Sequence, residues 1–313
     1  MNFLNGEKTM NEKTKGAFIA IVGKPNVGKS SVMNRILGQK VAIVSDKPQT
    51  TRNRIMGVLT EGETQLVFID TPGLHKPRNV LGQTMVKAIE DSVSDVDAAM
   101  LVVDASEFKG EPSKADISLI ERFNKQRIPA ILVINKIDLL NDKEKLLKIT
   151  AVYNELFPFG AIIYASARDG YGCDVIVNEL KAYAVEGPHF FDEDMLTDQT
   201  ERSLAAEIIR EKLLRSLNKE VPHGIAVVIE KFKDRKTTSG EDIVDIDAVI
   251  YCESDSHKGI VIGKGGAMLK KVSSYARRDM ETFFECKVNL SCWVKVKEDW
   301  RNRQALIHNF ELD

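Results

Sequence analysis

The strongest constraint on the fold of this chain is an octapeptide with a glycine at its start and another near its end, Gly23–Ser30. It follows the apolar run Phe18–Val22 and precedes a helical pattern. The glycines allow backbone N–H groups to turn inward around phosphate oxygens, and the helix adds the positive end of its dipole. An ordinary glycine turn is the alternative, and the position at a strand–helix junction disfavours it. The predicted phosphate-binding loop consists of Gly23, Lys24, Pro25, Asn26, Val27, Gly28, Lys29 and Ser30.

Length and composition limit the class of protein. The 313 residues are about right for two domains, and 43% hydrophobic with 29% charged residues excludes a wholly disordered chain. The net charge of −2 predicts no partner, so a nucleic-acid surface would need local segregation of charge. The four cysteines form no C-x-x-C pair, which disfavours a zinc site and favours a reducing compartment. With no apolar run near the roughly 18 residues of a membrane span, we expect a cytoplasmic protein without a transmembrane segment.

Residues 17–185 alternate short apolar runs with longer amphipathic stretches. Several runs are continuously apolar, as expected for strands that are buried on both faces of a parallel sheet. This alternation predicts a doubly wound α/β domain with a mostly parallel sheet, whose ligand lies at the carboxyl ends of the strands. The predicted strands are Phe18–Val22, Leu66–Ile69, Ala98–Val103, Ala130–Ile134 and Ile162–Tyr164.

The pattern changes after residue 185. We interpret residues 1–16 as a disordered or alternative-start extension, since Met10 is a second possible initiator, and residues 186–198 as a linker. Residues 199–313 then begin with an amphipathic helix, Gln199–Asn218. Two strands, a helix, a glycine turn, a second helix and a last strand follow, which predicts an α+β module in the order α-β-β-α-α-β.

Three further motifs each follow a predicted strand. A carboxylate at Asp70 can hold a water of Mg²⁺ bound to Ser30, and a backbone amide at Gly73 can contact a γ-phosphate, although a turn capped by Asp is an equally good reading of this motif alone. The carboxylate of Asp138 can accept two hydrogen bonds from guanine, which adenine cannot donate, so the motifs favour GTP over ATP. The predicted nucleotide contacts are Asp70, Thr71, Pro72, Gly73, Leu74, Asn135, Lys136, Ile137, Asp138, Ser166 and Ala167.

In this order the motifs resemble the translation-factor class of P-loop GTPases. The resemblance assigns the Mg²⁺ ligand that responds to the γ-phosphate to Thr51, with Thr50 as the alternative. We therefore expect catalytic contacts from Lys29, Thr51 and Gly73, and a metal site at Ser30, Thr51 and Asp70. Ras-like enzymes carry a water-orienting Gln where this chain has Leu74, so hydrolysis should be slow without a partner, a backbone-held water or another cation. Asn26 is similar to a residue that coordinates K⁺ in some relatives, which makes K⁺ a hypothesis for that cation.

The second module carries a G-x-x-G turn, which can clamp a nucleic-acid backbone because its glycines allow close approach. Between Lys258 and Arg303 there are 11 Lys and Arg against 5 Asp and Glu, although the whole chain is slightly acidic. This segregation and the order of elements are typical of a type II KH domain that binds single-stranded RNA. The predicted RNA contacts are Ile260, Ile262, Gly263, Lys264, Gly265, Gly266, Lys270, Lys271, Arg277 and Arg278.

A GTPase domain joined to a type II KH domain resembles the Era family of bacterial GTPases over nearly the whole chain. Further matches are Pro-Gln-Thr-Thr-Arg at 48–52, Asp-Thr-Pro-Gly-Leu-His at 70–75, Ile208–Leu213 and Trp293–Lys297. The resemblance implies GTP/GDP and Mg²⁺ as cofactors, binding near the 3′ end of 16S rRNA, a role in 30S subunit assembly, a monomer, and peripheral association with the inner membrane. Two alternatives stay open: a signalling switch whose second domain binds proteins, and an ATP-dependent P-loop enzyme.

Overall fold

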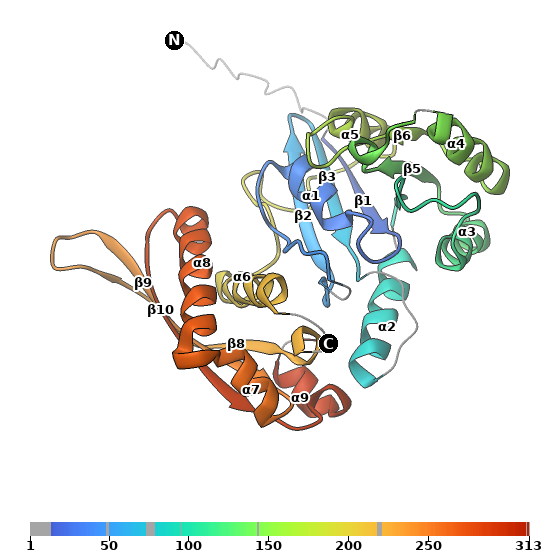
Figure 1. Ribbon diagram of the computed structural model, residues 1–313. Coiled ribbons are helices and arrows are strands. Elements are labelled where there is room, and N and C mark those ends of the chain that lie inside the picture. The colour runs from blue at the N-terminus through green and yellow to red at the C-terminus, as the bar shows by residue number, and fades with distance from the viewer. Residues whose placement is uncertain are drawn as a thin grey trace, which may run out of the picture.

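The computed structural model describes residues 14–47, 50–72, 79–94, 96–142, 144–217, 221–310 and 312. These residues form two modules, an α/β module at the amino-terminal side and an α+β module after residue 200 (Figure 1). Within this part of the chain, no helix is both long and apolar enough to cross a lipid bilayer.

The described residues of the first module hold a seven-stranded sheet. Its strands are β1 (Lys15–Val22), β2 (Ile55–Glu61), β3 (Thr64–Asp70), β4 (Ala98–Asp104), β5 (Ala130–Asn135), β6 (Ile162–Tyr164) and β7 (Val185–Glu186). The order is β2-β3-β1-β4-β5-β6, with parallel pairing from β3 to β6; β2 is antiparallel to β3, and β7 pairs antiparallel with β1. The predicted α/β class with a mostly parallel sheet is confirmed.

Strand β2 is absent from the sequence-based prediction. Its sequence is interrupted by Gly57, and glycine weakens a strand signal because it has no side chain to pack. The fold explains this residue: a Cβ at Gly57 would lie 2.6 Å from Cδ1 of Leu37 and 3.2 Å from Sδ of Met33. The glycine therefore lets the first helix pack closely on the sheet.

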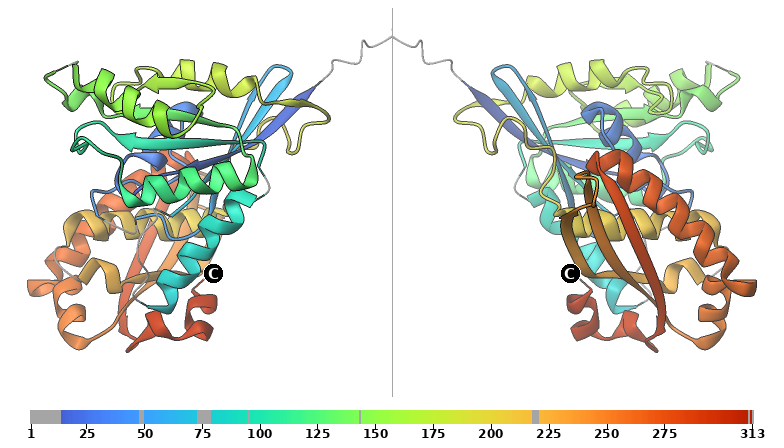
Figure 2. Two further views of the ribbon diagram at one scale, coloured as in Figure 1. Left: turned by 90° about the vertical axis from the view of Figure 1, so that its right-hand side faces the viewer. Right: turned by 90° about the vertical axis from the view of Figure 1, so that its left-hand side faces the viewer.

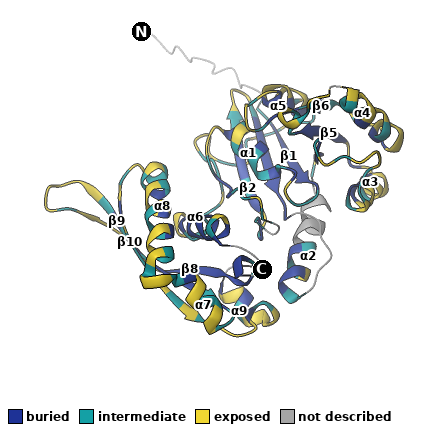
Figure 3. Cartoon of the chain, viewed as in Figure 1, coloured by how far each residue is buried: buried dark blue, intermediate teal, exposed yellow. Residues whose placement is uncertain are grey.

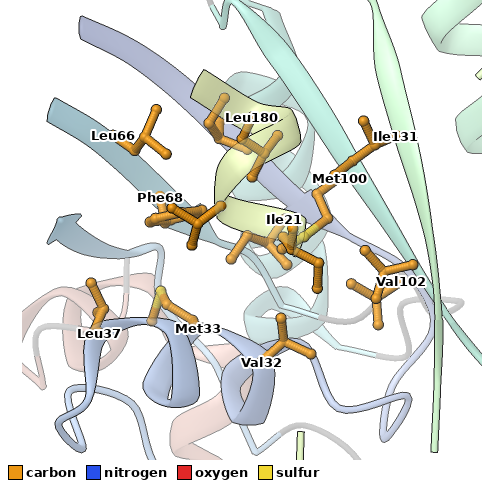
Figure 4. Packing of buried hydrophobic residues seen from close by; sticks show 14 of the residues in the cluster. Ile21, Val32, Met33, Leu37, Leu66, Phe68, Met100, Val102, Ile131 and Leu180 are labelled. Atoms are coloured by element: carbon orange, nitrogen blue, oxygen red, sulfur yellow. The ribbon is translucent and has the colours of Figure 1, made fainter. Parts of the chain in front are cut away.

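Helices cover both faces of this sheet. The helices of the first module are α1 (Lys29–Leu37), α2 (Val80–Ser94), α3 (Lys114–Gln126), α4 (Glu144–Leu156) and α5 (Cys173–Lys181). One face packs against α1 and α5, and Figure 4 shows Val32, Met33 and Leu180 around the strand residues Ile21 and Phe68. Side chains from α3 and α4 bury the opposite face. Covering both faces explains why these strands are apolar throughout.

The second module has the predicted order α-β-β-α-α-β. Its elements are α6 (Glu201–Ser216), β8 (Ala226–Lys236), β9 (Asp242–Cys252), α7 (Asp255–Ile262), α8 (Ala267–Phe284) and β10 (Lys287–Val296), followed by α9 (Gln304–Asn309). In the sheet order β10-β9-β8, β9 is parallel to β10 and antiparallel to β8. The faces of α6 and α8 that carry Leu204, Ile208 and Val272 bury the inner side of this sheet.

The two modules are packed against one another along α6 and α2 (Figures 1 and 2). Leu81 and Met85 of α2 join Trp300 and Phe310 of the second module in one buried apolar cluster. Figure 3 shows that α6 is largely buried, although it carries many charged residues. The predicted linker, residues 186–198, runs alongside the first sheet, where Leu196 O accepts a hydrogen bond from Val58 N of β2 at 2.9 Å.

Candidate nucleotide-binding site and glycine loop

The octapeptide forms the turn between β1 and α1. Two of its glycines adopt backbone conformations that other residues avoid, with φ of 144° at Gly23 and 101° at Gly28. A Cβ at Gly23 would lie 2.3 Å from Val102 O, and one at Gly28 would lie 2.3 Å from Nδ2 of Asn135. The glycines are therefore required both for the turn and for the close approach of the neighbouring strands' ends.

Lys29 is buried in this turn. Its Nζ donates to Gly23 O at 3.1 Å and to Lys24 O at 2.9 Å, so the ammonium closes the loop on itself. Burial lowers the pKa of Lys29 to about 8, and the carboxylates of Asp70 and Asp116 partly oppose the shift. An anion in the loop would compensate the desolvated ammonium, which is the situation expected of a phosphate-binding lysine.

The three predicted metal-site residues meet at one point although they come from α1, the loop before β2, and the end of β3. Ser30 Oγ donates to Asp70 Oδ2 at 2.5 Å and lies 3.0 Å from Thr51 Oγ1. Asp70 is fully buried, and its Oδ1 has no partner among the described residues. Two hydroxyls beside a buried carboxylate with an unused oxygen are a donor set that suits Mg²⁺. The residues therefore fit the ion that the motifs predict.

The alternative ligand, Thr50, lines the same cavity as Thr51, but its hydroxyl is engaged by other partners. Its Oγ1 donates to Lys47 O at 2.6 Å and contacts Ser45 Oγ at 2.8 Å. The geometry favours Thr51 for the metal site. Two other predicted contacts, Gly73 and Leu74, lie outside the described residues.

The environment of Asp70 gives a testable pH dependence. Burial raises its pKa from 3.8 to about 6, against the opposing effects of Lys29 and the Ser30 hydrogen bond. Because the folded pKa exceeds the unfolded value, the metal-free protein loses stability as the pH rises from about 4 to about 6. Relative to Asp70→Asn, we expect a loss of about 3 kcal/mol over this interval, measured by urea unfolding without Mg²⁺. Parallel stability curves for the two proteins would contradict the burial argument.

The second group of predicted contacts lies where β5 and β6 end. Asn135 donates from Nδ2 to Val27 O at 2.9 Å and accepts at Oδ1 from Ala167 N at 3.1 Å. It thereby ties the phosphate loop to the turn after β6. Asp138 Oδ1 accepts from Ser166 Oγ at 2.9 Å, which orients the carboxylate that the sequence assigns to guanine.

A cavity of about 740 Å³ joins these residues. Its walls include Gly28, Asn135 and Asp138, and an adjoining cavity of about 410 Å³ reaches Lys29, Ser30 and Thr51. Gly28, Ser31, Val44 and Lys136 line both cavities, so the two lie side by side, one lined by Asp138 and the other by Ser30 and Thr51. This space is large enough for a nucleotide.

Several residues of the site were not predicted. Asp104 ends β4, and its Oδ2 pairs with Lys136 Nζ at 2.6 Å, which holds the lysine beside the cavity. Burial alone would raise the pKa of Asp104, but hydrogen bonds from Lys136 and Ser106 outweigh it and lower the pKa. The sequence could have indicated Asp104 as a site residue, because it stands at the end of a continuously apolar strand. Lys40, Leu139 and Arg168 also line the larger cavity, and no local pattern marks them.

The predicted G-x-x-G motif, Gly263–Gly266, forms the turn between α7 and α8. Gly263, Gly265 and Gly266 have φ of 73°, 59° and 79°. A Cβ at Gly263 would lie 2.7 Å from Cβ of Met268, whereas the space around Gly265 and Gly266 is open. The turn therefore needs glycine at its start and leaves backbone accessible at its tip, as a loop that approaches a phosphodiester chain requires.

The predicted basic residues follow this turn on α8. Lys270 and Arg277 are seven residues apart, as are Lys271 and Arg278, so they form two neighbouring stripes on one exposed half of the helix. Arg277 also pairs with Glu281 at 2.8 Å. Before the turn, Ile260 is 48% exposed and Ile262 is half-buried. The cations and the apolar side chains are thus placed on both sides of the glycines.

Comparisons with known proteins agree with this geometry. A family model described as 50S ribosome-binding GTPase matches residues 18–136, and a KH domain model matches residues 220–301. GTPase Era of Clostridioides difficile is 50% identical over 296 residues, which cover 95% of this chain and 98% of that protein. The chain belongs to the Era family of GTPases. This membership confirms the resemblance that the motifs predicted.

Other members of the family extend the comparison. GTPase Era of Ruminiclostridium cellulolyticum is 47% identical over 94% of this chain and 96% of that protein. A crystal structure of Era in complex with MgGDPNP and nucleotides 1506–1542 of 16S ribosomal RNA has a TM-score of 0.90 at 37% identity, covering 96% of this chain and 99% of that one. A variant of Aquifex aeolicus Era bound to GDP·AlF4⁻ has the same TM-score, identity and coverage. A P-loop GTPase fold followed by a KH domain is therefore shown for this chain.

Proposed function

We propose that this GTPase binds GTP and Mg²⁺ at the edge of its first sheet, binds RNA through its glycine loop, and assists assembly of the 30S subunit. The observation that carries the nucleotide part is the meeting of Ser30 and Thr51 with Asp70 at the smaller cavity, while Asp138 lines the larger cavity beside it. For the RNA part, the solved Era complex supports 16S rRNA near its 3′ end as the partner. Mg²⁺ would be held by Ser30, Thr51 and Asp70, and when bound it neutralises developing phosphate charge.

The residues of this chain supply the remaining roles. Lys29 would bind the β- and γ-phosphates, and the Gly73 amide would contact the γ-phosphate. Asn26 Nδ2 donates to Asp46 O at 2.8 Å, so its carbonyl oxygen is the atom that would coordinate K⁺. K⁺ as a fixed charge is part of the proposal, as are slow hydrolysis without a partner, a cytoplasmic monomer, and peripheral association with the inner membrane. Slow hydrolysis rests on Leu74 standing where Ras-like enzymes carry Gln, the cytoplasmic location on composition, and the K⁺ and membrane parts on the resemblance.

The test is RNA binding in the two nucleotide states. We expect an RNA that spans the 3′ end of 16S rRNA to bind about tenfold more tightly with a non-hydrolysable GTP analogue than with GDP. Affinity should also fall steeply with salt, because Lys and Arg release counterions from phosphates. Identical affinity in both states would contradict the coupling. Intact GTP binding without RNA binding would instead support a signalling GTPase. Equal rates of GTP hydrolysis in K⁺ and in Na⁺ would refute the potassium part.

A further inference from the structure

The segment that carries Thr51, residues 41–47 and 50–52, is here called the switch segment. Its backbone is held by α6 of the second module, about 160 to 170 residues away in sequence. Val44 N donates to Glu211 Oε1 at 3.1 Å, and Val44 O accepts from Arg215 Nη2 at 2.8 Å. Arg210 donates to Thr50 O, the carbonyl directly before Thr51. Both polar backbone atoms of Val44 and the peptide next to the metal-site threonine are thus bound to one helix.

The residue after Thr51 is held by the same module. Arg52 is only 3% exposed, and it donates to Ile225 O at 2.6 Å and to His223 O at 3.0 Å. Its guanidinium lies over the Trp300 ring, 5.6 Å from the ring centre. The residues on both sides of Thr51 are therefore held by contacts to the second module.

Glu211 is the centre of these contacts. Its side chain is 0% exposed, and it accepts from Lys40 Nζ at 2.6 Å and Lys212 Nζ at 2.9 Å as well as from Val44. Burial alone would raise the pKa of Glu211, but these hydrogen bonds outweigh it and lower the pKa. A buried carboxylate with several donors is a rigid anchor, because losing any donor leaves charge uncompensated.

The same cluster reaches the RNA-facing helix. Lys40 Nζ also contacts Asp279 Oδ2 at 3.0 Å, and Asp279 lies on α8, which begins directly after the glycine loop. Lys40 and Val44 both line the nucleotide cavity. A chain of direct contacts therefore runs from the helix of the glycine loop to the switch segment.

We propose that α6 is a positioning element of the GTPase site, and that Arg210, Glu211 and Arg215 hold the switch segment so that Thr51 stays beside Ser30 and Asp70. The second module then does more than respond to the nucleotide. It holds the segment that senses the γ-phosphate in an ordered conformation, so that GTP binding loses less conformational entropy. By linkage, a ligand that moves α6 changes GTP affinity by the same factor by which GTP changes the affinity of that ligand. This inference deepens the proposed nucleotide site and rests on it.

The test uses Arg215→Ala, because Arg215 is half-exposed and its loss should not unfold the protein. We expect about fivefold weaker binding of a non-hydrolysable GTP analogue and less than about twofold change for GDP, since the threonine contact requires a γ-phosphate. Hydrogen exchange at the Val44 amide should become faster in the nucleotide-free protein. Arg215→Lys, which retains one donor, should recover part of both effects.

The matched control is Arg235→Ala, which removes an exposed arginine of the same domain that pairs with Asp245 at 2.8 Å, away from the switch segment. Unchanged GTP-analogue affinity and Val44 exchange in Arg215→Ala, relative to this control, would overturn the inference. Glu211→Gln should produce a larger effect in the same direction, and a cooperative thermal transition shows that it is folded. Failure of the wild-type protein to bind GTP would instead refute the proposed function, so the two outcomes are distinguishable.

Discussion

Asp138→Asn should weaken GTP binding by at least about a hundredfold, because an amide can accept only one of the two guanine hydrogen bonds and its NH₂ faces another donor. Xanthosine triphosphate should gain affinity, since xanthine carries a carbonyl where guanine has the exocyclic amine. ATP should gain none. Asn can still accept from Ser166 Oγ, the present partner of Asp138 at 2.9 Å, so the fold should persist. Competition against a fluorescent GTP analogue measures all three affinities.

The control for this variant is Asp142→Asn, the same substitution at an exposed position four residues later. It should bind GTP like the wild-type protein. If Asp138→Asn kept its GTP affinity, the cavity at the end of β5 would not be the base site. If it bound ATP instead, the assignment to guanine would be wrong.

Replacing Lys264 and Gly265 by Asp should reduce RNA affinity by more than about fiftyfold, because two carboxylates would face the phosphodiester chain at the tip of the loop. The space around Gly265 can accommodate the new side chain, although its φ of 59° adds some strain. GTP affinity should be retained in the absence of RNA, because the loop is not among the residues that line the nucleotide cavities. Filter binding with 16S rRNA fragments gives the affinity.

A control with the same change in net charge is Lys125→Asp combined with Gln126→Asp, at the exposed end of α3. This protein should bind RNA nearly as well as the wild type. Equal losses in both variants would show that only overall charge matters, and no loss in either would support a protein-binding role for the second domain.

The sequence-based prediction of the nucleotide site rests on local signals, which the topology of the sheet brings together. Each motif ends a strand, and parallel strands bring their carboxyl ends to one edge of the sheet. Asn135 and Ala167 therefore meet, with Ala167 N donating to Asn135 Oδ1, although neither motif alone predicts the contact. The glycines of both loops also predicted turns, because a backbone with positive φ or a close neighbouring atom excludes most other residues.

Neither strand β2 nor the choice between Thr50 and Thr51 could be predicted from the sequence. Both needed the tertiary structure. Gly57 obscures the strand in sequence, and only the packing of Leu37 against it explains the glycine. The two threonines are adjacent and chemically identical, so no pattern separates them. Their surroundings do, because only Thr51 lies beside Ser30.

The role of α6 illustrates the same division. The spacing of its apolar residues, including Leu204 and Ile208, predicted an amphipathic helix, and no role in it was predicted for Arg210 or Glu211. In the structure both are buried against the switch segment. Sequence alone thus indicated most of the elements, though not β2, and the two glycine loops, since those depend on neighbours in the chain. The tertiary structure decided which charged face is an interface, because that depends on how two separately encoded modules dock.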